Sequence, residues 1–149
     1  MRSGRLTLAL LLLESTFAIS QSNPMEATLF ESINHDRKTH SLRPLHWDDA
    51  LAAAARKHAQ EMAKREAVEH TFPSEPSLPS RATKAGARFI SIAENVVRAG
   101  NAKAAHTEFM NSSNHKANIL DPDIDSIGIG AVEHGGELFV VEDFSKAKK

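Results

Sequence analysis

One polar stretch of this sequence holds residues whose types and order could do chemistry. Residues 111–120 read NSSNHKANIL and place His115 between a predicted helix end and the apolar pair Ile119 and Leu120. A histidine titrates near neutral pH, and its neutral ring binds metal ions. Two interpretations remain open: His115 belongs to a solvated turn, or it faces a cleft that holds a ligand or a metal.

The same stretch places Ser112 near His115, which raises the question of a serine nucleophile. No GxSxG motif surrounds Ser112, and no third residue is identifiable that would orient the histidine. Serine side chains commonly hydrogen-bond nearby backbone groups at helix ends. We therefore interpret Ser112 as a capping or helix-terminating residue.

Composition limits the kinds of site that this chain can build. None of its 149 residues is a cysteine, so any metal must be held by His, Asp or Glu. The formal net charge is −1, and no cluster of Lys and Arg marks a surface for nucleic acid. Hydrophobic residues make up 41% and charged residues 25%, as is typical of soluble globular proteins. We expect a monomer without a nucleic-acid partner.

The N-terminus has the form of a secretory signal peptide. Residues 1–20, MRSGRLTLALLLLESTFAIS, run from two arginines through an apolar segment to the small residues Ala18 and Ser20, just before Gln21. The apolar segment is shorter than the roughly 20 residues that a membrane-spanning helix needs. We predict cleavage after Ser20, a secreted or periplasmic protein, and a single mature domain over 21–149 without a transmembrane segment.

The spacing of hydrophobic residues predicts several helices in the first two thirds of the chain. A first helix follows Asn23 as cap, and an Ala-rich helix follows Asp48 or Asp49, with His58 as a hydrogen-bonded core histidine on its apolar stripe. Three further segments have weaker patterns: a Pro-containing surface loop over 71–88, a short helix over 89–100 that ends at Gly100, and a helix that begins at the cap Asn101. So long a loop often borders a functional site.

The C-terminal part changes from a helical to a strand pattern. Residues 126–134 alternate Ile127, Ile129 and Ala131 toward one face, and Gly135 and Gly136 form a two-residue hairpin signal before ELFVVEDF. Helices that precede an antiparallel hairpin are typical of an α+β domain.

Several ordered motifs together resemble the CAP domain, the superfamily of cysteine-rich secretory, antigen 5 and pathogenesis-related proteins, in its short cysteine-free bacterial form. The similarity covers roughly residues 27–144. The motifs that carry it are INHDRKTHSLRPLHWDDALAAAARKHAQEMA, AENVVRAG, FMNSSNHKANILDPDIDSIGIGAV and VVEDF.

This resemblance implies an α-β-α sandwich with a small antiparallel sheet and a central cleft. Larger relatives line that cleft with two His and two Glu, which can hold a divalent metal. His70 and His115 take the places of the two histidines, and Glu94 takes the place of one glutamate. Ser112 stands where the other glutamate would be, and Phe109 replaces the usual tryptophan.

Two functional classes follow from this set of residues. Two neutral imidazoles, His70 and His115, can bind zinc or another divalent cation weakly, with waters in the open positions. Glu94 can ligate directly or accept a hydrogen bond from a liganding imidazole. The favoured interpretation is a secreted binding module for a lipid, a peptide or a cell-envelope component. The alternative is a metal-assisted peptidase or esterase with Glu94 as base.

Overall fold

The computed structural model describes residues 23–148, so the predicted signal peptide lies outside the described residues. The elements follow one another as α1 (Pro24–Thr39), β1 (His46–Trp47), α2 (Asp49–Arg65), α3 (Leu78–Ala85), β2 (Phe89–Ala99), α4 (Ala102–Asn111), α5 (Ser113–Ile119), β3 (Ser126–His134) and β4 (Glu137–Ala147).

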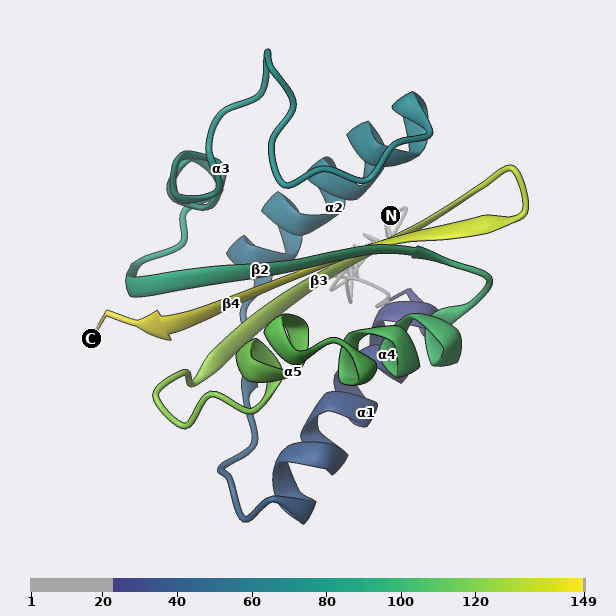
Figure 1. The fold of residues 1–149 in the computed structure, drawn as a ribbon. Helices are drawn as coiled ribbons and strands as arrows, with labels where there is room; N and C mark the ends of the chain where they lie inside the picture. The colour runs from purple at the N-terminus through teal and green to yellow at the C-terminus, as the bar shows by residue number, and fades with distance from the viewer. Residues whose placement is uncertain (1–22, 149) are drawn as a thin grey trace, which may run out of the picture.

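The strands form one sheet in the order β1-β3-β4-β2. Strands β2, β3 and β4 pair antiparallel, and the short β1 joins β3 in parallel, so the sheet is mixed. Helices α2 and α3 lie on one face of the sheet, and α1, α4 and α5 lie on the other (Figure 1). This arrangement confirms the predicted α+β class and the α-β-α sandwich.

The two longest helices begin where the sequence predicts. The Asn23 side chain accepts a hydrogen bond from the backbone N–H of Met25, and Pro24 occupies the first helical turn of α1. The Asp48 side chain accepts from two backbone N–H groups at the start of α2. Each cap satisfies donors that a helix end would otherwise leave unpaired.

Two glycines of β3 explain why α2 is so rich in alanine. A Cβ added at Gly128 or Gly130 would overlap the backbone of α2 at Ala52 or Ala55. Helix and strand therefore approach more closely than larger side chains permit. The predicted hairpin is also confirmed, because Gly135 and Gly136 both have positive φ between β3 and β4.

Two predicted elements are wrong. Residues 89–99 form the strand β2, not a helix, and β2 pairs with β4 along nearly its whole length. The segment 71–88 is not all loop, because it contains the helix α3 between the N-cap Ser77 and the left-handed Gly86. Residues 89–99 form a strand because their backbone pairs with β4, about fifty residues further along the chain. A residue's preference for a strand depends on such neighbours in the sheet as well as on its own type.

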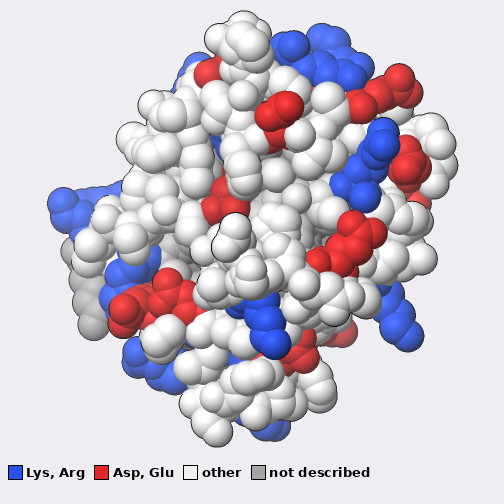
Figure 2. Space-filling model, viewed as in Figure 1, with Lys and Arg blue, Asp and Glu red and all other residues white. Residues whose placement is uncertain are grey.

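Charged side chains of both signs are distributed over the surface. Lys and Arg side chains are interspersed with Asp and Glu over the face that Figure 2 shows. Within residues 23–148, no helix combines the length and apolar character that crossing a bilayer requires.

Candidate functional site

His115 lies in the short helix α5, so the interpretation that it belongs to a turn is wrong. The preceding helix α4 ends at Asn111, as predicted, and the chain re-enters a helix at Ser113. The His115 ring meets the buried Phe109 ring edge-on at 5.2 Å between centroids. Phe109 therefore fixes one side of the imidazole.

Ser112 joins the two helices. Its backbone N–H donates to the Phe109 carbonyl, and its own carbonyl accepts from the backbone N–H of Lys116. Its side chain forms no capping hydrogen bond. Within residues 23–148, no hydrogen bond joins the Ser112 and His115 side chains, so a serine–histidine nucleophile has no support here.

His70 and Glu94 are in direct contact although 24 residues separate them. His70 Nδ1 lies 2.9 Å from Glu94 Oε1. The His70 side chain is 62% exposed, whereas that of Glu94 is 2% exposed. A carboxylate only accepts hydrogen bonds, so Nδ1 carries the proton and Nε2 is left free. The carboxylate thus fixes the orientation of an otherwise exposed ring.

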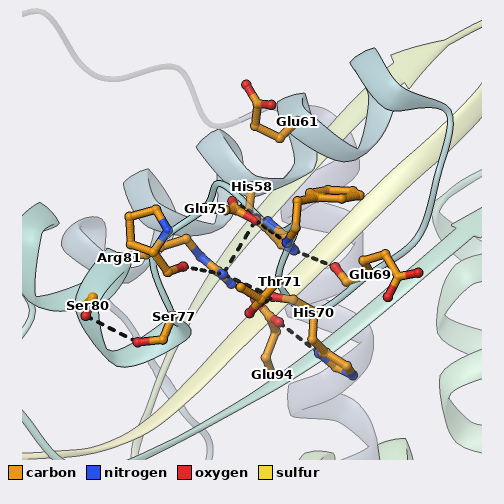
Figure 3. Close-up of polar contacts among 12 residues, drawn as sticks. His58, Glu61, Glu69, His70, Thr71, Glu75, Ser77, Ser80, Arg81 and Glu94 are labelled. Carbon is orange, nitrogen blue, oxygen red and sulfur yellow. Dashed lines mark hydrogen bonds and ion pairs between the residues drawn. The ribbon is translucent and has the colours of Figure 1, made fainter.

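Arg81 holds this pair in place from α3, and the sequence did not identify it. Its Nη2 forms a buried ion pair with Glu94 Oε2. Its Nη1 donates to the backbone carbonyls of His70 at 3.0 Å and Pro76 at 3.3 Å. Figure 3 shows Arg81 reaching Glu94 and Glu75 beside the His70 ring. Both Glu94 oxygens are therefore engaged, one by His70 and one by Arg81.

A second buried acid lies beside Glu94. Asp143 of β4 is its direct partner across the strand pair, and it is fully buried. Neither of its carboxyl oxygens makes a hydrogen bond of regular geometry among the described residues. Burial raises the pKa of Asp143 well above its ordinary range. The adjacent Glu94 side chain raises the pKa further, by its charge and by direct contact, whereas the charge of Arg81 lowers it. In the sequence, the signal that could have pointed to Asp143 is its place beside another acid in the apolar segment VVEDF.

Successive residues of a strand face opposite sides of the sheet. In β2, Glu94 therefore faces His70 on one side, and Asn95 faces α5 on the other. Asn95 Nδ2 donates to Glu142 Oε2 at 3.1 Å and to the His115 carbonyl at 3.2 Å. Asn118 Nδ2 donates to Asn95 Oδ1 at 2.9 Å. Strand β2 lies at the edge of the sheet.

His115 has a shifted titration. Burial lowers the pKa of His115, and the charge of His70 lowers it further. The neutral form of His115 is therefore favoured at physiological pH. No group of three or more His, Asp or Glu side chains in residues 23–148 is arranged to hold a metal ion.

His58 has the predicted structural role. Its ring is fully buried, with Nδ1 2.7 Å from Glu75 Oε1 and Nε2 2.8 Å from the Glu69 carbonyl. Both nitrogens are occupied, so His58 is not available as a ligand.

Several bacterial proteins are similar to this chain in sequence or structure. The protein YkwD of Bacillus subtilis (strain 168) is 30% identical over 122 residues, which cover 81% of this chain and 48% of that protein. An extracellular protein with an SCP domain from Bacillus anthracis (strain Ames) is 25% identical with a TM-score of 0.78, over 83% of this chain and 41% of that chain. An outer surface protein of Borrelia burgdorferi is 23% identical with a TM-score of 0.78, over 85% of this chain and 95% of that chain.

This chain spans about half the length of the curated relative that it matches. The agreement with the family nevertheless extends through all the segments that build the site. The model of the CAP family, the cysteine-rich secretory protein family, matches residues 30–144, and the chain belongs to this family although it contains no cysteine.

Proposed function

We propose that the chain is an exported binding module whose site at His70, Glu94 and His115 takes a lipid, a peptide or a cell-envelope component. The observation that carries the proposal is the contact of His70 Nδ1 with Glu94 Oε1 at 2.9 Å. It orients the exposed ring and leaves Nε2 free for an incoming group. A preoriented donor or ligand atom lowers the cost of binding.

The state of Glu94 favours binding over hydrolysis. A general base must have a free oxygen within reach of the proton that it takes. Here one Glu94 oxygen accepts from His70, and the other is paired with Arg81. Asp143 is buried and favours its neutral form, and Ser112 lacks a bond to His115. Glu94, the base that the hydrolase alternative needs, thus has no free oxygen.

The donor set fits weak binding of a divalent cation such as zinc. His70 offers Nε2, with its Nδ1–H bonded to a carboxylate, as in many histidine ligands of metals. His115 favours its neutral form, which is the form that ligates. Two protein ligands leave positions open. A bound cation would supply a positive centre for a carboxylate, phosphate or carbonyl oxygen of the ligand.

Export is part of the proposal. The order of basic, apolar and small residues in positions 1–20 supports cleavage after Ser20 and a secreted or periplasmic location. The relatives described as an extracellular protein and an outer surface protein support the same location. N-terminal sequencing of the exported protein should begin at Gln21, and a mature fraction that retains Met1 would contradict it.

Calorimetric zinc titration tests the binding site. His115→Ala should lose at least about tenfold in affinity, as expected for the loss of one of two ligands. His35→Ala is the matched control, because His35 is an exposed histidine of α1, and it should bind like the wild type. Equal affinity in all three proteins would refute the cation site, and cation-dependent turnover of a peptide or ester library would refute the binding module.

A further inference from the structure

A groove on the helical layer of α2 and α3 lies on the opposite face of the sheet from His115, and it shares Arg81 with the site described above. It has a volume of about 560 Å³ and runs between α2 and the segment 74–85. Its α2 wall contains positions 53, 57, 61 and 65, which are four residues apart and so share one helix face. At 1.5 Å per residue this wall is about 18 Å long.

The groove is positively charged, whereas the chain as a whole has a net charge of −1. Four basic side chains line it against two acidic ones, and both acids are already engaged. Glu61 pairs with Arg65 at 3.3 Å, and Glu75 bonds to the buried His58. Within residues 23–148, Lys57 and Lys84 make no ion pair, so two exposed cations face the groove unneutralised.

Arg81 adds an unmet donor to the same wall. Its side chain is 5% exposed, and its two terminal nitrogens bond to Glu94, His70 and Pro76. Its Nε, however, is buried without an acceptor among the described residues. A buried donor without a partner is uncommon in folded proteins, and a bound ion or ligand that accepts from it is one of the ordinary explanations.

Apart from Ser74, the remaining lining of the groove is apolar. Ala53, Ala54, Pro76 and Ala85 present methyl and ring carbons beside the stems of the lysines. The α2 wall is a regular helix whose backbone groups are already paired, so it offers no hydrogen bonds to an extended peptide. A ligand with an apolar body and a single charged head suits such a lining better.

We propose that this groove binds a small organic anion, with its carboxylate or phosphate between Lys57 and Lys84 and its apolar body on the alanine surface. The volume lies within the range of small-molecule sites. The groove shares Arg81 with the site at His70 and Glu94, but the head group is assigned to Lys57 and Lys84. Among the described residues these two lysines form no hydrogen bond or ion pair with His70, Glu94 or His115, so the inference does not rest on the proposed cation site.

Titration of the purified protein with octanoate, followed by calorimetry and amide NMR in the presence of EDTA, tests the proposal. The double variant Lys57→Gln, Lys84→Gln should lose at least about tenfold in affinity, since each lysine contributes a charge-assisted hydrogen bond. The control variant Lys64→Gln, Lys103→Gln removes two exposed lysines of α2 and α4 that do not line the groove, and it should bind octanoate like the wild type.

Ala53→Phe places a ring in the groove at an exposed position and should block octanoate while zinc binding is unchanged. Octanol, which has the same body without the charge, should bind much more weakly than octanoate. Equal octanoate affinity in the two double variants would overturn the proposal. So would binding to phosphatidylglycerol vesicles without binding to monomeric octanoate, because the ligand would then be a membrane surface.

Discussion

Glu142 is a fully buried carboxyl group, and replacing it should change how the stability of the protein depends on pH. Its Oε2 accepts a hydrogen bond from Asn95, but its Oε1 has no partner among the described residues. Burial raises its pKa from the ordinary 4.5 to about 8, and the Asn95 hydrogen bond opposes the rise. The folded state therefore holds a proton that the unfolded state releases at a much lower pH.

The sign and size of the effect follow from that difference. Between pH 4.5 and about 8 the folded state binds more protons than the unfolded state, so stability falls as pH rises. Each pH unit in this range is worth about 1.4 kcal/mol. Glu142 thus lowers the free energy of unfolding by about 4 kcal/mol between pH 5 and pH 8, a large part of the roughly 5–15 kcal/mol that stabilises a typical domain.

Glu142→Gln removes the titration and keeps the shape of the neutral acid. The glutamine amide of the variant does not titrate, so any cost of leaving it unpaired is the same at both pH values. The informative quantity is therefore how much the difference in free energy of unfolding between variant and wild type changes from pH 5 to pH 8. We expect the variant to gain about 4 kcal/mol relative to the wild type over this interval. Urea denaturation followed by circular dichroism at pH 5, 6.5 and 8 measures it.

Glu133→Gln is the matched control, because Glu133 is an exposed acid on the same hairpin. Its pH profile should run parallel to that of the wild type. If the profile of Glu142→Gln is also parallel to that of the wild type, Glu142 does not titrate in this range and the reasoning fails.

Three further substitutions test the packing and the charges around the site. Arg81→Met should cost about 3–5 kcal/mol, because it removes the buried ion-pair partner of Glu94 Oε2. Urea denaturation measures the loss, and a loss below about 1 kcal/mol would contradict this reasoning. Ser112→Glu should strengthen zinc binding about tenfold in calorimetry by adding a carboxylate, whereas Ser112→Ala should leave it unchanged; no gain with Glu would place residue 112 outside the site. Gly130→Ala should cost about 1–3 kcal/mol or more, since its Cβ would overlap the backbone of α2 at Ala55; an unchanged thermal midpoint would refute that close packing.

The sequence alone determined the elements whose signals are local. Asn23 and Asp48 mark the starts of α1 and α2, and Gly135 and Gly136 mark the hairpin. Each of these residues acts on backbone groups within a few positions of itself, so its effect can be read without knowing the fold. The order of the motifs then indicated the sandwich.

Elements that depend on distant partners were not predictable in the same way. Strand β2 contains Glu94 and Asn95 in an apolar run that fits a helix as well as a strand, and its pairing with β4 decides the matter. Helix α3 had local signals in Ser77 and Gly86, but the prolines of the segment 71–88 favoured a loop interpretation.

Some residues of the candidate site were identified from the sequence, and others only from the tertiary structure. His70, Glu94 and His115 were identified from the resemblance to the family, and the structure adds that His70 and Glu94 are in contact. Arg81 and Asp143 emerged only from the tertiary structure, because a buried ion pair and a raised pKa depend on which groups are brought together and how far water is excluded. The ion pair of Arg81 and the raised pKa of Asp143 produce no periodic pattern or residue spacing in the sequence. Both depend on how α3, β2 and β4 pack in the folded protein.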